Sequence, residues 1–349
     1  MTTNFIPGLK LCGLFYGEII KPILDLNFPN MRYSAALIGA GSEVLGFDTE
    51  MSSDHDWGPR IKLFLDEDNF EENAKAIEVL IKGKLPNRFR NYPVQWTIDG
   101  PSGNVCVELL TIRSFFLAYL NFDIRGEIRP ADWLTFPEQK LRTVISGEIY
   151  RDDLGLQAIR ERFGYYPHDV WLYLMAAQWQ RIGQEEHLMG RAGMAGDEIG
   201  SALIAARLVR DLMRLCFLME KQYPPYAKWF GTAFARLAGA EVLMPLLSRV
   251  LVGSTWLERQ EFLVPAYEIV AARHNELEIT EALTPKVSHF HGRPFLVIDG
   301  GRFAGAIRKK INDPVVKRIA ERWLIGNVDQ FSDSTDLLDE ARSFRSLFE

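Results

Sequence analysis

The chain has 349 residues, a formal net charge of −6, 47% apolar residues and 25% charged residues. This length exceeds that of a usual single domain, so two domains are expected, and the composition is typical of a globular protein. The acidic net charge argues against a protein that coats nucleic acid without sequence preference, but it allows a small basic pocket for a polyphosphate.

The cysteines and the N-terminus exclude further classes. Cys12, Cys106 and Cys216 lie far apart without paired spacing, so neither a disulfide framework nor a zinc site is indicated. The N-terminus lacks a basic-then-apolar signal pattern, and no apolar run approaches the roughly 18 residues that a membrane span needs. A cytoplasmic protein without a membrane segment is expected.

The first third of the chain is expected to mix helices with strands. In chain order, we expect an amphipathic helix over residues 5–29, a buried strand over 33–41, an alternating strand over 60–65, a helix over 66–83 and two strands around a Gly-Pro turn within 93–112.

The rest of the chain is expected to be mainly helical. Helical apolar periodicity covers residues 113–122, 170–190, 198–223 and 256–277, and one strand-like run within 290–307 precedes further helices. Long helices with short connections suggest a bundle. The predicted fold class is therefore α+β, with a small mixed-sheet domain over residues 1–120 followed by a helical-bundle domain over residues 121–349.

The first candidate site feature is the glycine-serine turn within "LIGAGSEVLGFDTEMSSDHDWGPRIKLFL", residues 37–65. Gly39, Gly41 and Ser42 end a strand and open what we expect to be a short helix over 42–47. Glycine lets the backbone approach a ligand closely, and amides at a helix N-terminus attract phosphate oxygens. The turn therefore suggests a phosphate cradle.

The second feature is a pair of aspartates, Asp54 and Asp56, that follows this turn. On an extended segment their period-2 spacing sends both carboxylates to the same face. Two adjacent carboxylates repel each other unless a cation is present, and magnesium takes hard oxygen ligands together with phosphate oxygens. Two such ions between carboxylates and a triphosphate would assist in-line attack at phosphorus.

This order and spacing resembles the signature of the DNA polymerase β-type nucleotidyltransferase superfamily. That signature is an apolar residue, Gly, Gly or Ser, a spacer of about ten residues and Asp-x-Asp, and the resemblance covers residues 30–112. The longer strings "GSEVLGFDTEMSSDHDWGPR", "PPYAKWFGTAFARL" and "DQFSDSTD" resemble a large bacterial family of uncharacterised proteins, a domain of unknown function, that carries this domain. The first resemblance implies a fold, a metal site and a reaction type.

The superfamily usually adds a third carboxylate on a later strand. Glu108 fits best, because Val107 and Leu109 beside it would face away from it. Asp99 is the alternative, and initiation of the adjacent Gly-Pro turn is its other interpretation. The chain departs from the pattern at His55, where the family usually has an apolar residue.

The resemblance therefore implies a metal site of Asp54, Asp56 and Glu108 for two Mg²⁺ ions. Gly41 and Ser42 would hold the phosphates of the nucleotide, and Ser53 is added as a nucleotide-binding candidate.

Two residues of the helical part are further candidates. Lys228 stands near a helix start, where its charge opposes the helix dipole unless an anion is bound, and related two-domain transferases place such a lysine on the triphosphate. The alternative is a surface lysine beside core aromatics. Asp197 is a candidate general base for the acceptor hydroxyl, although a helix cap is the preferred interpretation.

Arg207, Arg210 and Arg214 make one helical face basic. This face either lines a cleft opposite the metals or, as we prefer, is solvated and paired with Asp211 and other acids. The histidines show no metal-ligand spacing.

These features predict a transferase that moves a nucleoside monophosphate, by default AMP from ATP, onto a hydroxyl or similar group. No feature of the sequence identifies the base of the donor nucleotide, and a small-molecule acceptor is preferred over a protein side chain or an RNA end. The rival hypothesis is an inactive nucleotide-sensing or partner-binding module on the same scaffold.

Overall fold

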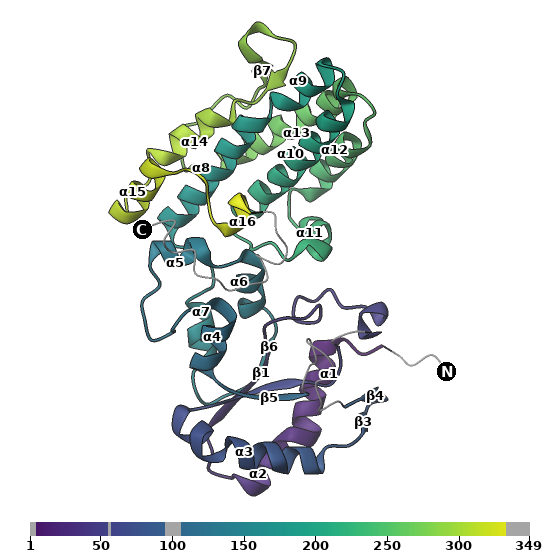
Figure 1. The fold of residues 1–349 in the computed structure, drawn as a ribbon, viewed down its shortest axis with the longest axis vertical. Helices are drawn as coiled ribbons and strands as arrows, with labels where there is room; N and C mark the ends of the chain where they lie inside the picture. Colours follow the sequence, from purple (N-terminus) through teal and green to yellow (C-terminus); the bar gives the residue numbers. More distant parts are fainter. Residues whose placement is uncertain (1–4, 55–56, 95–105, 333–349) are drawn as a thin grey trace. The chain divides into compact units, whose positions relative to one another are not determined.

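The computed structural model of the chain describes residues 5–54, 57–94 and 106–332, with Ser53 and Asp54 described by their backbone alone. The chain divides into two compact units (Figure 1). Unit 1 comprises Met1–Glu127 and Gln139–Gly164, and unit 2 comprises Ile128–Glu138 and Tyr165–Glu349. A mixed sheet lies in unit 1 and a helical bundle in unit 2, so the predicted α+β class is confirmed.

The sheet of unit 1 has the strand order β5-β2-β1-β6. Strand β1 (Tyr33–Leu37) pairs antiparallel with both β2 (Ile61–Leu65) and β6 (Glu148–Asp152), whereas β2 pairs in parallel with β5 (Val107–Thr111). The sequence predicted β1, β2 and β5 from their apolar runs. Strand β1 is buried along its whole length because it has a neighbour on each side.

The N-terminal helix and α3 of unit 1 lie in the segments where the sequence predicted helices. The N-terminal helix consists of α1 (Gly8–Phe15), a π-helical turn (Tyr16–Ile20) and α2 (Lys21–Asn27). Helix α3 (Glu67–Lys84) starts at Asp66, whose carboxylate accepts a hydrogen bond of 2.8 Å from the backbone N of Asn69. This N-cap supplies an acceptor for one of the free amides of the first turn.

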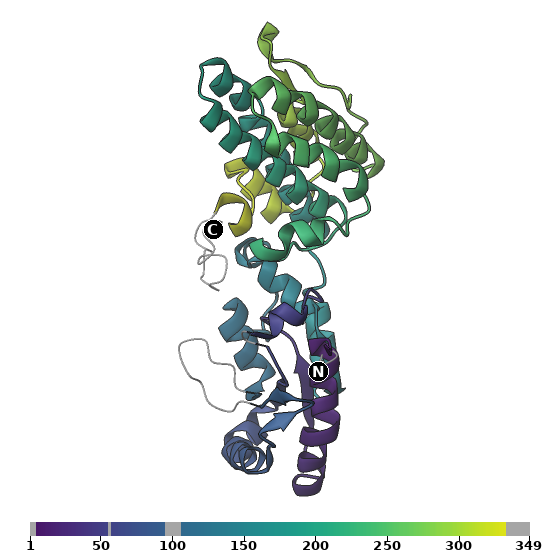
Figure 2. The same ribbon diagram turned by 90° about the vertical axis from the view of Figure 1, so that its right-hand side faces the viewer.

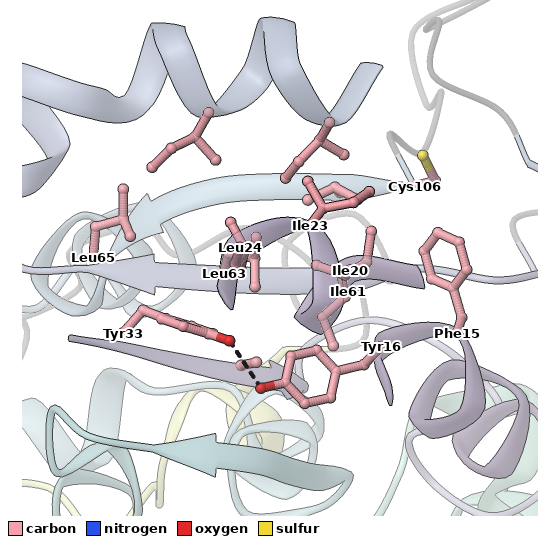
Figure 3. Close-up of a cluster of buried hydrophobic side chains, with 14 of the residues drawn as sticks. Phe15, Tyr16, Ile20, Ile23, Leu24, Tyr33, Ile61, Leu63, Leu65 and Cys106 are labelled. Carbon is pink, nitrogen blue, oxygen red and sulfur yellow. Dashed lines mark hydrogen bonds between the residues drawn. The ribbon is translucent and has the colours of Figure 1, made fainter. Parts of the chain in front are cut away.

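The core of unit 1 lies between these helices and the odd-numbered residues of β1, β2 and β5 (Figure 3). The hydroxyl groups of Tyr16 and Tyr33 form a hydrogen bond of 3.1 Å inside it, so both buried phenols are satisfied. The buried members of this core are Leu11, Phe15, Tyr16, Ile20, Ile23, Leu24, Met31, Tyr33, Ala35, Ile61, Leu63, Leu65, Ile77, Ile81, Phe89, Cys106 and Val107.

The opposite face of the sheet carries the even-numbered residues, because side chains alternate along a strand. Phe64 packs edge-on against Phe115 of α4 (Ile112–Leu120), with ring centroids 5.7 Å apart. The charged residues Lys62 and Glu108 lie on this face, since they have the same parity as Phe64 in the register of β2 and β5. Val107 and Leu109 contact the core instead, as predicted for residues that flank Glu108.

The division of the chain differs from the predicted boundary at residue 120. Unit 1 also takes residues 139–164, which contain β6 and α7 (Leu156–Glu161). The signal for β6 was weak, because its sequence EIYRD is short, carries three charges and is exposed at both ends. Helix α5 (Pro130–Thr135) belongs to unit 2, so the chain enters unit 2 and returns before the sheet is complete.

Unit 2 is a bundle around α8 (His168–Glu185), which contacts α10 (Glu198–Met219) and α14 (Gly300–Arg308) (Figure 2). Its other elements are α9 (Leu188–Met194), α11 (Ala227–Phe234), α12 (Ala240–Val252), α13 (Trp256–Glu276), β7 (Ser288–His289), β8 (Leu296–Val297), α15 (Pro314–Arg322) and α16 (Val328–Phe331).

Some smaller expectations can be assessed as well. Cys12, Cys106 and Cys216 are buried free thiols. Within the described ranges, no helix has both the length and the apolar character needed to cross a bilayer. Of the segment 93–112, the structure describes the end of β4 (Tyr92–Pro93), which forms a hairpin with β3 (Arg88–Phe89), and strand β5, while the expected Gly-Pro turn lies outside the described residues.

Candidate functional site

The site begins with the glycine turn that follows β1. Gly39, Gly41 and Gly46 have φ angles of 91°, 145° and 67°, which side-chain-bearing residues rarely adopt. The prediction of a short helix over residues 42–47 is wrong. The segment is a turn closed by a hydrogen bond of 3.0 Å from the Phe47 N to the Ser42 O, and the positive φ of Gly46 prevents helical continuation.

Gly41 leaves room that no other residue would leave. A Cβ atom at this position would stand 2.4 Å from Nη2 of Arg60 and 2.7 Å from both carboxylate oxygens of Glu43. The backbone amides of Gly41 and Ser42 have no acceptor within the described part of the chain. Free amides in a turn of positive-φ glycine form an anion-binding concavity, which supports the predicted phosphate cradle.

A fixed positive charge lies beside this turn. Arg60 donates from Nε to Oε1 of Glu43 over 2.9 Å and from Nη2 to the carbonyl O of Ala40 over 2.7 Å. The Glu43 side chain is only 2% exposed and that of Arg60 13%. Because the partners are buried and hydrogen-bonded, the guanidinium cannot move far, and the Glu43 carboxylate at the same turn balances its charge.

Lys62 connects the glycine turn with Glu108. The two residues are register partners on β2 and β5, and Nζ of Lys62 forms an ion pair with Oε2 of Glu108. Cε of Lys62 would lie 3.6 Å from a Cβ atom on Gly39, and its Nζ lies 5.7 Å from the ring centroid of Phe115. Glu108 therefore lies one side chain away from the turn, on the same face of the sheet.

The burial of this pair is unequal. The Glu108 side chain is 45% exposed, whereas that of Lys62 is 18% exposed. Burial lowers the pKa of Lys62, and the neighbouring Glu108 opposes this effect. The carboxylate is thus open to solvent on one side and held by an ammonium group on the other.

The predicted aspartates are placed only in part. Asp54 ends a 3₁₀ helix, Glu50–Asp54, so the strand geometry from which we argued a common face with Asp56 does not apply to its backbone. The side chains of Ser53 and Asp54, and the whole of His55, Asp56 and Asp99, lie outside the described residues. The convergence of the carboxylates stays a prediction.

The described residues can be tested for their fit to magnesium. Apart from the segments left undescribed, no group of three or more His, Cys, Asp or Glu side chains could hold a metal ion. Glu108 is a hard oxygen donor, half exposed and close to the glycine turn, which suits Mg²⁺. Its partner Lys62 already supplies a positive charge there, so a metal ligand role for Glu108 requires the ammonium to move aside.

The candidates in unit 2 occupy ordinary structural positions. Asp197 is the N-cap of α10, and its carboxylate accepts a hydrogen bond of 2.7 Å from the backbone N of Gly200, in agreement with the preferred interpretation. Lys228 is the second residue of α11, is exposed and lies 4.9 Å from the ring centroid of Trp229. Their catalytic and binding roles stay predictions.

Acids engage the basic face of α10, in agreement with the preferred interpretation, but Asp211 is not the acid that pairs with Arg207 or Arg214. Arg207 pairs with Glu185 over 3.0 Å and Arg214 with Glu138 over 2.9 Å. Asp211 pairs with Arg181 on α8 instead, over 2.9 Å, because it points into the bundle and is 1% exposed. Arg210 also has an interaction partner, so this face consists of engaged residues.

Sequence reasoning missed Glu43, Arg60 and Lys62. The sequence did contain a signal for these residues. Arg60 and Lys62 alternate with apolar residues in the strand segment, and basic residues on a buried strand need anionic partners. Their partners Glu43 and Glu108 lie 17 and 46 residues away in sequence, and such pairing follows only from the register of the folded sheet.

Comparison with known proteins adds two similarities. Residues 133–230, which run from α5 into α11 and include Asp197 and Lys228, match the family model of a domain of unknown function, DUF4037. A crystal structure of a nucleotidyltransferase-like protein from Exiguobacterium sibiricum 255-15 matches 78% of this chain and 82% of that chain, with 14% sequence identity and a TM-score of 0.35. No curated protein matches significantly.

Proposed function

We propose that this protein is a nucleotidyltransferase that moves a nucleoside monophosphate from a nucleoside triphosphate, ATP by default, to a hydroxyl or similar group of a small molecule. The observation that carries this proposal is the glycine turn, in which the amides of Gly41 and Ser42 have no acceptor among the described residues and lie beside the fixed guanidinium of Arg60. The order of this turn and the Asp54–Asp56 pair in sequence provides the second support.

The turn would bind the phosphates that leave. The amides of Gly41 and Ser42 would donate to phosphate oxygens, while Arg60, whose charge Glu43 balances, keeps its contacts to Glu43 and Ala40 and holds the turn in place. Bound in this way, the triphosphate is oriented and its negative charge is partly neutralised. Orientation of this kind lowers the entropic part of the barrier to transfer.

The carboxylates would hold the metal. Asp54, Asp56 and Glu108 provide the hard oxygen ligands, and two Mg²⁺ ions bound there would neutralise charge on the α-phosphate and on the departing pyrophosphate. Glu108 would take this role once the Lys62 ammonium, with which it forms an ion pair, moves aside. We propose further that Lys228 contacts the triphosphate and that Asp197 accepts the proton of the acceptor hydroxyl.

The second candidate is an inactive module that binds the nucleotide without transferring it. It is favoured by the Lys62–Glu108 ion pair, because an ammonium group on the third expected ligand competes with a metal ion. The two candidates share nucleotide binding at the glycine turn and differ in their need for the metal.

Magnesium-dependent ATP binding to the full chain tests the proposal. Wild-type protein is expected to bind ATP more tightly with Mg²⁺ than with EDTA, and the variant Asp54→Asn/Asp56→Asn is expected to lose this difference. Pyrophosphate release in the presence of a metabolite extract should fall by about 100-fold or more in the variant. Equal binding by both proteins, with and without metal, would contradict the metal site.

Gly41→Ala tests the cradle separately. The new Cβ would collide with Arg60 and Glu43, so we expect weakened ATP binding by about tenfold and a loss of about 1–3 kcal/mol in the free energy of unfolding. Gly17→Ala is the matched control in the same unit, because nothing lies within 4 Å of its added Cβ. ATP binding by Gly41→Ala at the wild-type level would exclude the turn as the phosphate site.

A further inference from the structure

A pocket lies in unit 2, at the end of the bundle where Figure 1 shows α9 beside β7. It has a volume of about 460 Å³ and is lined by Arg191, Met194, Ala195, Arg293, Pro294 and Phe295. This volume lies in the range of small-molecule sites. The lining combines two guanidinium groups with apolar side chains and contains no acid.

The charge around this pocket is positive and uncompensated. Among the described residues, neither Arg191 nor Arg293 makes an ion pair or donates a side-chain hydrogen bond. The pKa of the adjacent His187 is lowered, first by burial and then by the positive charges of Arg191, His291 and Arg293. Two unpaired guanidinium groups that face one hollow are favourable ligands for a carboxylate or phosphate.

The apolar wall of the pocket is preformed. Phe295 is 3% exposed and lies so close to Gly190 that a Cβ atom there would stand 2.5 Å from its Cδ1. Its ring centroid is 5.8 Å from that of Trp256, and its carbonyl O accepts a hydrogen bond of 2.9 Å from the backbone N of Phe290. Met194, in contrast, is 62% exposed and can cover an apolar group.

Ring stacking holds the α9 side of the pocket against the segment that carries Arg293. Phe290 lies 4.2 Å from His187, ring centroid to ring centroid, with an interplanar angle of 18°. This contact joins the start of α9 to the segment that carries Arg293, whose backbone N donates to the carbonyl O of Phe290 over 2.9 Å. The backbone segments that carry the two arginines are therefore held together without a bound molecule.

We propose that this pocket binds a small organic anion. Arg191 and Arg293 receive its phosphate or carboxylate group, and Phe295 and Met194 contact its apolar body. All of these residues belong to unit 2, so the inference depends neither on the glycine turn of unit 1 nor on the transferase function.

The test uses three probes with the full chain and isothermal titration calorimetry, without Mg²⁺ or nucleotide. Phenyl phosphate and benzoate represent the two headgroups on an aryl body, and inorganic phosphate lacks the body. At least one aryl probe is expected to bind, and Arg191→Gln/Arg293→Gln is expected to weaken that binding by about tenfold or more. Failure of both aryl probes to bind wild-type protein would overturn the proposal.

Matched controls separate this pocket from unspecific charge and from the site in unit 1. Arg308→Gln/Arg322→Gln removes two exposed arginines of the same unit and is expected to leave binding unchanged. Asp54→Asn/Asp56→Asn and Gly41→Ala should also bind the aryl probe at the wild-type level. Equal losses in the control and the pocket variants, or loss of binding only in the unit 1 variants, would overturn the assignment.

The apolar contact has its own variant. Met194→Gln is expected to reduce the preference for phenyl phosphate over inorganic phosphate by about threefold, because it removes apolar contact area and leaves both arginines in place. An aryl probe that binds no tighter than inorganic phosphate to wild-type protein would show that the apolar wall makes no contribution, and would overturn the organic-anion part of the proposal.

Discussion

The two units use the same kind of ion pair in opposite surroundings. In unit 1, the Glu108 carboxylate that pairs with Lys62 is 45% exposed and lies beside a turn with free amides. In unit 2, the Glu138 carboxylate that pairs with Arg214 is 5% exposed and is enclosed by other polar side chains. Both pairs join distant parts of the sequence, so sequence separation does not distinguish their roles.

The enclosed pair is part of a structural network. Tyr166 Oη donates to Glu138 over 3.4 Å, and Nδ2 of Asn327 donates to the same Tyr166 hydroxyl over 3.1 Å. Asp329 accepts a hydrogen bond of 2.8 Å from the backbone N of Glu138. A charged pair suggests a binding site when open backbone donors and solvent lie next to it, whereas an enclosed pair belongs to the fold, because loss of either partner leaves a buried charge without its counter-charge.

The largest loss of stability should come from breaking the enclosed ion pair of Glu138 and Arg214. Arg214→Met leaves the Glu138 carboxylate buried without its cation, so we expect a loss of about 3–5 kcal/mol in the free energy of unfolding of unit 2. Denaturant unfolding, followed by tryptophan fluorescence and circular dichroism, measures this loss.

Arg207→Met is the control on the same helix. Arg207 pairs with Glu185 at a position where the arginine side chain is 46% exposed, so its removal should cost less than about 1 kcal/mol. Similar losses in both variants would show that burial does not separate the two kinds of pair.

A pH dependence of intermediate size should follow from Asp329. Burial, together with the Glu138 charge, raises the pKa of Asp329 to about 7. Between about pH 4 and pH 7 the folded protein therefore holds a proton that the unfolded chain has released, and the free energy of unfolding falls as pH rises, by at most about 1.4 kcal/mol per unit.

Asp329→Asn removes the titrating carboxyl group and should flatten the dependence of the free energy of unfolding on pH. The asparagine Oδ1 can still accept the hydrogen bond from the backbone N of Glu138. Denaturant midpoints measured from pH 5 to pH 8 for both proteins provide the check. Parallel curves would mean that Asp329 does not titrate in this range.

The smallest stability effect is expected at Glu108, with a large effect on ligand binding. Glu108→Gln removes a half-exposed partner and should change the free energy of unfolding by less than about 1 kcal/mol. Magnesium-dependent ATP affinity should nevertheless fall, because a metal ligand is lost.

Glu18→Gln is the control, since Glu18 forms an ion pair of 2.5 Å with Arg90 in the same unit and is 44% exposed. It should match Glu108→Gln in stability and keep wild-type ATP affinity. Unchanged ATP affinity in Glu108→Gln would remove this residue from the candidate site.

Much of the fold could be predicted because periodicity is a local property. The apolar run of β1 and the helical spacing of α8, α10 and α13 are visible in short windows of sequence. Strand β6 was not predicted, because only two of its five residues are apolar and its partner strand β1 lies more than 100 residues away in sequence. Such pairing is stabilised by the completed sheet and leaves little local trace.

The candidate site was predicted in its backbone and missed in its side chains. Gly41 and Ser42 could be recognised because a turn of positive φ restricts residue types. Arg60 and Lys62 could not be assigned, because their partners Glu43 and Glu108 are defined by register and by a turn conformation. The predicted helix after Ser42 failed at Gly46, whose φ of 67° reverses the chain.

The late position of β6 has a consequence for protein synthesis. Until residues 148–152 leave the ribosome, β1 has β2 on one side and an unpaired edge on the other. An exposed apolar edge strand is a template for pairing with other chains. Nascent chains that stall after residue 120 would therefore present Tyr33–Leu37 to their neighbours, and chaperone contact with this edge would be most useful before β6 emerges.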